Sequence, residues 1–159
     1  PGVLEMQSLP VVAVMQQPWI IAHRGASAIA PENTLLAFRL AAEAGAEMIE
    51  TDAHLTRDGE IILMHDADLG RTTNCIGIIG DYCRSDIEAC DTGYWFAPNG
   101  DKHHPFRGLG LKVPTLRGMF VTLDELNPRL HVNVEIKNSP DTLGYDPGHR
   151  VAAALVSLV

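Results

Sequence analysis

Histidines and basic residues stand beside short apolar runs, where they could act on a phosphate group. His23 and Arg24 follow one such run, and His65 follows another. A histidine with an ordinary pKa of about 6.5 can accept and donate protons at neutral pH, and two histidines can divide the acid and base roles in a displacement at phosphorus. Arg24 offers planar, two-pronged recognition of a phosphate, and Lys137 adds a point charge. We take the histidines as candidate catalytic residues and the cations as candidate phosphate contacts.

Three carboxylates form a candidate metal site. Glu50 and Asp52 lie two residues apart, so on a strand they project from the same face, and Glu135 comes from another predicted strand. At about 4 Å and an effective dielectric near 20, each pair of like charges costs on the order of 4 kcal/mol, so protons or a divalent cation must be present. Oxygen-only ligands suit Mg²⁺ or Ca²⁺.

Ordinary structural roles compete with each of these assignments. A solvated strand face explains an isolated Glu-x-Asp pair, a single histidine is more often structural than catalytic, and either cation could form a surface ion pair. It is the combination of these residues at neighbouring strand ends that favours a catalytic site. His54 shares the face of the carboxylate pair, but we expect it near the rim. The sequence contains no nucleophile elbow, P-loop or dinucleotide fingerprint.

Alternating strands and helices are predicted to position these residues. Apolar runs and alternation predict four strands, at residues 19–22, 46–55, 61–64 and 131–137. Helix signals appear after Thr34, closing at Gly45, and over residues 116–126 and 148–159. Residues 67–113 read as an insertion with a short helix near 85–90. This order favours a parallel α/β sheet or barrel, in which the active site is assembled at the carboxyl ends of different strands.

Composition limits the class of protein. The 159 residues, 46% apolar and 20% charged, indicate a single soluble domain, and the net charge of −8 argues against a nucleic-acid partner. No apolar run is long enough for stable membrane insertion, and no signal peptide is visible. The odd set of cysteines, Cys75, Cys83 and Cys90, favours free thiols in a reducing, cytoplasmic compartment, with a periplasmic or secreted location as the alternative if a signal precedes Pro1. Residues 1–17 are predicted to be a tail or a covering strand.

Seven ordered motifs between residues 19 and 138 resemble the glycerophosphodiester phosphodiesterase family. In chain order they are His23-Arg24-Gly25, Pro31-Glu32-Asn33-Thr34, Glu50-Thr51-Asp52, Thr56-Arg57-Asp58-Gly59, His65-Asp66 with Leu69 and Arg71-Thr72-Thr73, Val113-Pro114-Thr115-Leu116, and Glu135-Ile136-Lys137.

The resemblance implies a fold, a reaction and a set of roles. The fold would be a TIM (β/α)8 barrel of the phospholipase C-like phosphodiesterase type, with its small insertion after the third strand. The reaction would be metal-dependent hydrolysis of glycerophosphodiesters to sn-glycerol 3-phosphate and an alcohol. The implied roles are acid/base catalysis by His23 and His65, binding of Mg²⁺ or Ca²⁺ by Glu50, Asp52 and Glu135, and phosphate contact by Arg24 and Lys137.

Length sets this chain apart from the family pattern. A complete barrel needs about 250 residues, so residues 1–159 are expected to be the N-terminal half of one domain, prone to aggregate without the other half. Two alternatives stay open: a phospholipase D-like enzyme acting on lysophospholipid or sphingomyelin, and a non-catalytic fragment that needs a partner. A homo-oligomer is also compatible with the sequence.

Overall fold

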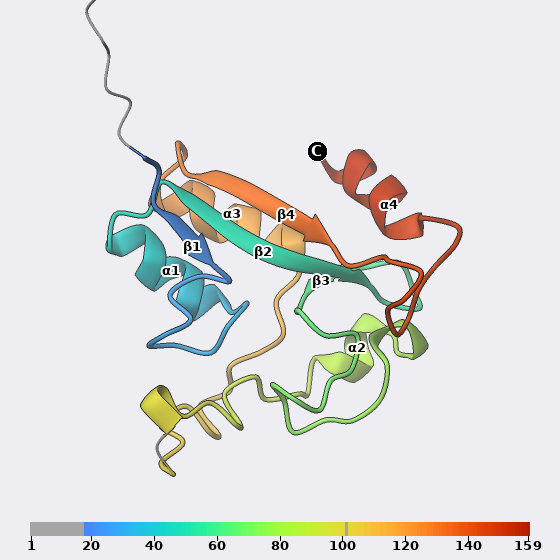
Figure 1. Ribbon diagram of the computed structural model, residues 1–159, viewed down its shortest axis with the longest axis horizontal. Helices are drawn as coiled ribbons and strands as arrows, with labels where there is room; N and C mark the ends of the chain where they lie inside the picture. Colours follow the sequence, from blue (N-terminus) through green and yellow to red (C-terminus); the bar gives the residue numbers. More distant parts are fainter. Residues whose placement is uncertain (1–17, 101) are drawn as a thin grey trace, which may run out of the picture.

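The computed structural model describes residues 18–100 and 102–159, so the prediction for residues 1–17 lies outside the described residues. Figure 1 shows a small sheet flanked by helices, with an irregular segment extending below it. The strands are β1 (Ile21–His23), β2 (Met48–Leu55), β3 (Ile61–Leu63) and β4 (His131–Ile136). The helices are α1 (Leu35–Glu43), α2 (Arg84–Ile87), α3 (Leu116–Leu126) and α4 (Arg150–Leu158), with short 3-10 turns at Ile79–Asp81 and Pro98–Gly100. Within the described part, none of these helices is long and apolar enough to cross a membrane.

The sheet is mixed, which differs in one respect from the parallel arrangement that the element order favours. β1 and β4 both pair with β2 in parallel, whereas β3 pairs with the end of β2 in antiparallel fashion. The reason is the connection between β2 and β3, which is a tight turn through Asp58 and Gly59. A parallel crossover needs a dozen residues or more, so this short turn can only form a hairpin.

Strand β2 is the centre of the fold. Its residues from Ile49 to His54 are all buried, because other strands and helices cover both of its faces. The main core combines residues of β2 and β3 with Phe38 of α1, Met119 of α3 and Val151 of α4. Polar side chains on such a strand are therefore held in fixed positions away from bulk water.

The predicted boundaries of α1 and α3 are confirmed, whereas α2 ends at Ile87, three residues before the predicted end, and α4 begins at Arg150, two residues after the predicted start. The Thr34 hydroxyl accepts a hydrogen bond from the Ala37 amide at 3.1 Å and caps α1, and Gly45 follows its last turn with φ of 88°. Both are standard ways of satisfying the free backbone groups at helix ends. Helix α3 spans the predicted residues 116–126, with Thr115 as its N-cap.

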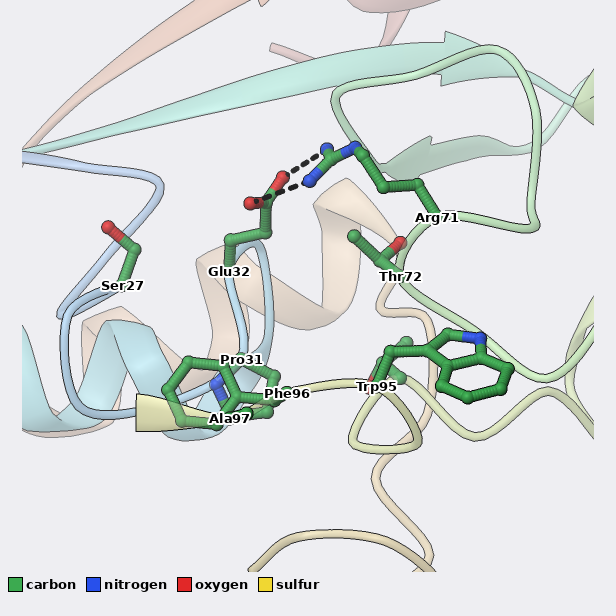
Figure 2. Close-up of a pocket in the computed structure, with 9 residues that line it drawn as sticks. Ser27, Pro31, Glu32, Arg71, Thr72, Trp95, Phe96 and Ala97 are labelled. Carbon is green, nitrogen blue, oxygen red and sulfur yellow. Dashed lines mark hydrogen bonds and ion pairs between the residues drawn. The ribbon is translucent and has the colours of Figure 1, made fainter. Parts of the chain in front are cut away.

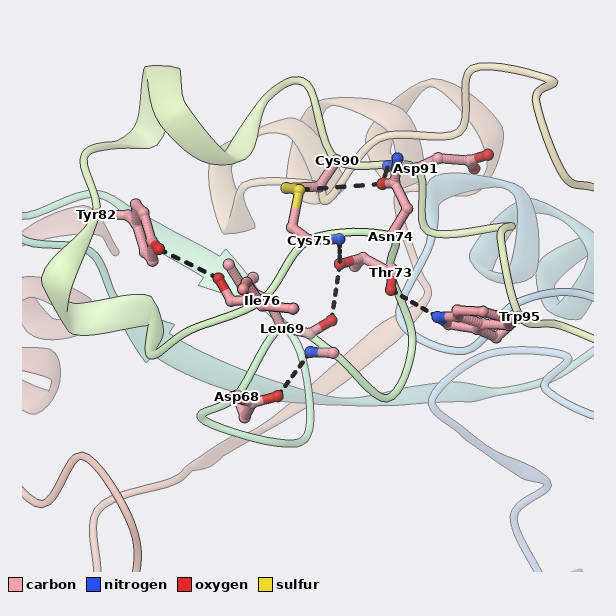
Figure 3. The surroundings of a disulfide bond; sticks show 11 residues. Asp68, Leu69, Thr73, Asn74, Cys75, Ile76, Tyr82, Cys90, Asp91 and Trp95 are labelled. Atoms are coloured by element: carbon pink, nitrogen blue, oxygen red, sulfur yellow. Dashed lines mark hydrogen bonds between the residues drawn. A yellow bond between two sulfur atoms is a disulfide. The ribbon is translucent and has the colours of Figure 1, made fainter.

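The insertion has a small core of its own, and one sequence prediction fails there. Cys75 and Cys90 form a disulfide (Figure 3), and Cys83 is a free thiol. The prediction of free thiols was wrong because pairing depends on spatial proximity: the fold brings both residues to a cluster that contains Leu69 and Ile87. A disulfide is typical of oxidising compartments, so the cysteines no longer support the cytoplasmic location, which stays a prediction.

Candidate active site

Two chain segments meet along one edge of β2, beside the predicted carboxylates. After β1, the Arg24 amide donates to the Glu50 carbonyl at 2.9 Å, and after β3 the Met64 amide donates to the Asp52 carbonyl at 3.0 Å. Carbonyls two residues apart point to the same side of a strand, so both segments lie on the same edge. The antiparallel direction of β3 lets its carboxyl end approach that of β1. His65 is thereby delivered to the region that His23 also borders.

The three predicted metal ligands come together in space. One carboxylate oxygen each from Glu50, Asp52 and Glu135 lies within 4.8 Å of the others. The sheet register explains this, because Asp52 of β2 is paired directly with Glu135 of the neighbouring strand β4. Glu50 and Asp52 are buried, whereas the Glu135 side chain is 54% exposed, so the group is reached from solvent on the Glu135 side.

The electrostatics of this group favour a bound cation. Burial raises the pKa of Glu50, and the negative charge of Asp52 raises it further, with a smaller contribution from Glu135. A hard divalent cation between the oxygens would remove that repulsion. The geometry therefore fits the predicted use of Mg²⁺ or Ca²⁺ and gives no preference between them.

Asp52 has no solvent exposure and is surrounded by three donors. Lys137 Nζ lies 3.0 Å from Oδ1, Arg24 Nε lies 3.2 Å from Oδ2, and Asn33 Nδ2 donates to Oδ2 at 2.8 Å. Lys137 also contacts Glu135 at 2.6 Å. Burial lowers the pKa of Lys137, but these two carboxylates outweigh burial and raise it overall. Both predicted phosphate contacts thus lie directly against the acidic group.

The backbone around these donors is held in unusual conformations. Arg24 and Asn33 have φ values of 60° and 54°, in the left-handed region that non-glycine residues rarely adopt. The Asn33 amide donates to the Arg24 carbonyl at 3.0 Å, which ties the two residues together. Such strain costs of order 1–3 kcal/mol per residue and persists where surrounding contacts enforce it, often at functional sites.

The two histidines have different surroundings. The His23 side chain is 66% exposed, and its Nε2 lies 3.8 Å from Glu50 Oε2. His65 is half-buried, and its Nδ1 lies 2.6 Å from Asp66 Oδ1. An ionised Asp66 would favour the tautomer with hydrogen on Nδ1, which leaves Nε2 available to exchange a proton. His54, in contrast, is buried and bonds through Nε2 to the His65 carbonyl at 3.1 Å, outside the carboxylate group.

A network of ion pairs links the two sides of the site. Glu32 accepts hydrogen bonds of 3.1 and 2.6 Å from Arg71 (Figure 2). Arg71 is also paired with Asp66. Glu32 also lies 3.3 Å from Arg24. The chain of contacts therefore runs from His65 through Asp66, Arg71 and Glu32 to Arg24.

Asn33, Glu32, Asp66 and Arg71 contact the site, and no role was predicted for them from the sequence. Their signal was present, since all four stand inside the family-like motifs, but residue types alone do not reveal which buried carboxylate an asparagine will contact. The structure brings Glu50, Asp52, Glu135, Arg24 and Lys137 into one group and places His23 at its edge. The individual roles of these residues stay predictions.

Comparisons with known proteins point to one family. Residues 23–156 match the sequence model described as "Glycerophosphoryl diester phosphodiesterase family". A glycerophosphodiester phosphodiesterase of Bacillus subtilis is 41% identical over 122 residues, which cover 77% of this chain and 40% of the relative. One from Caldanaerobacter subterraneus is 40% identical over 119 residues, which cover 75% of this chain and 45% of the relative. The chain thus spans about half the length of the curated relatives it matches.

Solved structures share the fold. A glycerophosphodiester phosphodiesterase from Agrobacterium tumefaciens superposes with a TM-score of 0.67 at 36% identity, covering 89% of this chain and 54% of that one. A phosphodiesterase from Oleispira antarctica, solved with the product sn-glycerol-3-phosphate, superposes with a TM-score of 0.72 at 30% identity, covering 89% and 51%. The fold described above is thus the first part of the barrel of these enzymes.

Proposed function

The chain belongs to the glycerophosphoryl diester phosphodiesterase family, and we propose that the protein hydrolyses glycerophosphodiesters to sn-glycerol 3-phosphate and an alcohol with the help of a divalent cation. The observation that supports this best is the convergence of Glu50, Asp52 and Glu135 within 4.8 Å beside His23. Two buried carboxylates beside a third, exposed one are costly to hold together unless a cation is part of the working site.

Glu50, Asp52 and Glu135 would hold Mg²⁺ or Ca²⁺, and the bound cation would supply positive charge to the phosphoryl oxygens. Arg24 and Lys137 balance the carboxylates in the structure, and both reach toward the same space. With the carboxylate charge neutralised by a cation, Arg24 and Lys137 would be free to direct their positive charge at the phosphate. The negative charge of the three carboxylates and the positive charge of the cation, Arg24 and Lys137 would then be balanced around one substrate.

The histidines would move the protons. One accepts the proton of the substrate's glycerol hydroxyl as its oxygen attacks phosphorus, and the other donates a proton to the alcohol oxygen as its bond to phosphorus breaks. The product is a cyclic phosphate. A water molecule then opens it with the roles reversed, so each histidine returns to its starting state. Asp66 fixes the ring of His65 for this task through the contact with Nδ1.

Matched variants test this proposal. We expect His23→Ala and His65→Ala to abolish release of sn-glycerol 3-phosphate from glycerophosphocholine while divalent-cation binding, measured by titration calorimetry with Mg²⁺ and Ca²⁺, is largely retained. Glu50→Ala should lose the cation. His131→Ala is the control, because His131 lies at the opposite end of β4 from Glu135. An unchanged hydrolysis rate in either histidine variant would remove that histidine from the mechanism.

A further inference from the structure

One segment of the insertion, residues 94–112, differs in charge from the chain as a whole. The chain has a net charge of −8, whereas this segment combines three cations with one acidic residue and so has a net charge of +2. In chain order these charged residues are Asp101, Lys102, Arg107 and Lys112. We call residues 94–112 the insertion tip.

Large apolar side chains accompany these cations at the surface. Trp95 is 49% exposed and Leu109 is 66% exposed. The three cations of the tip are exposed as well. Figure 1 shows the 3-10 turn Pro98–Gly100, in yellow, well below the sheet. The tip therefore presents apolar and positively charged side chains to solvent at some distance from the core.

The cations and the aromatic rings belong to one continuous surface. The Arg107 guanidinium lies 4.3 Å from the centre of the Tyr94 ring and 5.3 Å from that of the Trp95 ring. Arg107 and Tyr94 also line a cavity of about 320 Å³ together with Lys112. Leu109 lies between the two cations in the sequence. A partner that covers this cavity would therefore meet both cations.

Hydrogen bonds hold the tip in place. Trp95 Nε1 donates to the Thr73 carbonyl at 2.8 Å (Figure 3), so the indole ring is fixed although half of it is exposed. The Gly108 amide donates to Asp91 Oδ2 at 2.7 Å, which anchors the chain just before Leu109. A surface that is already ordered loses little conformational entropy when it binds a partner.

This combination of side chains fits the surface of an anionic bilayer. Tryptophan and leucine side chains partition into the headgroup region, and lysine and arginine are attracted by anionic lipids. Leu109 stands between Gly108 and Gly110, so its sequence neighbours have no side chains that would shield it. An exposed leucine of this kind suits a soft interface that closes around it. The charge of the tip is also opposite to that of the bilayer, whereas the chain as a whole would be repelled.

We propose that the insertion tip docks the protein peripherally on an anionic phospholipid bilayer, with its apolar side chains in the headgroup region and its cations against lipid phosphates. This inference goes beyond the proposed function, because it concerns the surface to which the protein binds and does not depend on hydrolysis. Trp95 also lines the cavity beside Glu32 and Arg71 (Figure 2), so docking would bring the candidate active site close to the bilayer.

Vesicle flotation tests this docking with the whole chain. The protein should float with vesicles of phosphatidylcholine and phosphatidylglycerol in equal amounts and stay at the bottom of the gradient with vesicles of phosphatidylcholine alone. High salt should release it, because screening weakens the attraction between exposed charges. Aggregated protein sinks, so flotation distinguishes binding from self-association. No flotation with the anionic vesicles, or equal flotation with both kinds, would overturn the proposal.

Two matched pairs of variants locate the contact. Leu109→Ser and Lys112→Gln should each weaken binding to the anionic vesicles by about fivefold, the effect expected when one leucine is no longer partly buried or one cation is lost near the surface. Val156→Ser on α4 and Arg129→Gln before β4 change exposed residues of the same kinds elsewhere and should bind like the parent. Equal weakening in the tip variants and in these controls would exclude the tip as the contact surface.

The fluorescence of Trp95 reports the contact directly. Trp19→Phe leaves Trp95 as the only tryptophan of the chain, and Trp19 itself stacks on His131 at the start of β4. In this variant the emission should shift to shorter wavelength when anionic vesicles are added. Inorganic phosphate and polyglutamate should cause no such shift. A shift of the same size with either of them would overturn lipid docking in favour of a small anion or an acidic protein.

Discussion

Asp52 illustrates how single residues determine this site. Its carboxylate is fully buried, so the donors around it must replace the water that would otherwise stabilise a negative charge. Arg24 and Lys137 supply opposite charge, and Asn33 supplies a neutral N–H at 2.8 Å. The Asn33 carbonyl oxygen also accepts from the Thr51 hydroxyl at 2.7 Å, which fixes the orientation of the amide. Asn33 is therefore a positioning residue for Asp52.

Substitution of Asn33 should destabilise the protein in a defined order. A hydrogen bond to a charged group contributes about 1.5–3 kcal/mol, so Asn33→Gly should lower the free energy of unfolding by about 2 kcal/mol. Asn33→Ala should lower it by about 1 kcal/mol more, because alanine also bears the strain of a φ of 54°. Urea denaturation measures both values. A glycine variant as stable as the parent would show that the contact with Asp52 contributes nothing.

The ion pairs of Arg71 should make stability depend on pH in the acid range. Burial raises the pKa values of Glu32 and Asp66, but contacts with Arg71 outweigh it and lower them from 4.5 and 3.8. Because these pKa values are depressed by folding, the stabilisation is complete above the unfolded values and is lost as pH falls through the folded ones.

Arg71→Met tests this dependence. In the parent, the free energy of unfolding should fall on acidification below about pH 4.5, and the variant should show a shallower fall. Urea titrations at a series of pH values provide both curves. If the two curves are parallel throughout the acid range, the pairs with Arg71 do not contribute to pH-dependent stability.

At the scale of elements, the hairpin between β2 and β3 matters for the site. Since β3 runs antiparallel to β2, its carboxyl end reaches the Asp52 carbonyl. That carbonyl lies two residues from Glu50, whose carbonyl accepts the hydrogen bond from the Arg24 amide after β1. A parallel β3 would have delivered His65 to a different position. The loop after β1 is equally constrained, because it must turn back onto α1 directly after Arg24.

Gly25 is the residue that makes this turn feasible. Its φ is 80°, and a Cβ added there would come within 2.7 Å of the Ala37 backbone in α1. Gly25→Ala should therefore lower the free energy of unfolding by about 3 kcal/mol, from strain and overpacking together. Gly45→Ala is the matched control, because Gly45 has a similar φ of 88° but open space around it, and should lose only about 1 kcal/mol. Equal losses in calorimetric melting would contradict the close contact.

How far the sequence predicts these elements depends on whether the signal is local. The bounds of α1 and α3 follow from periodicity and from caps such as Thr34, which act within a few residues. The grouping of Glu50, Asp52 and Glu135 follows from alternation along strands that end together. The Cys75–Cys90 disulfide and the role of Asn33 depend on contacts between distant segments, which no local pattern contains.

At the scale of the whole molecule, apolar surface and strand edges are left open. Within the described residues, β1 and β4 each pair with β2 alone, and Ile20 and Ile21 beside the β1 edge are 64% and 52% exposed. Open edges with apolar side chains promote association. The 159-residue chain should therefore self-associate with rising concentration in sedimentation velocity experiments.

A surface charge at this edge should suppress that association. Ile20→Lys places a charge next to β1, whereas Val156→Lys places one on α4 at a position that is 76% exposed. We expect the first variant to sediment as a smaller species than the parent and the second to behave like the parent. Identical sedimentation of all three proteins would show that the β1 edge is not the contact surface.

The proposed reaction requires Glu50, Asp52 and Glu135 to bind one divalent cation, and anomalous diffraction from crystals grown with Mn²⁺ can locate that ion. Mn²⁺ shares the preference of Mg²⁺ for oxygen ligands and scatters anomalously. We expect a single strong peak within coordinating distance of all three carboxylates, with Lys137 Nζ displaced from Asp52 and Glu135. Mn²⁺ bound elsewhere, with Asp52 and Glu135 still paired to Lys137, would contradict cation binding at this site.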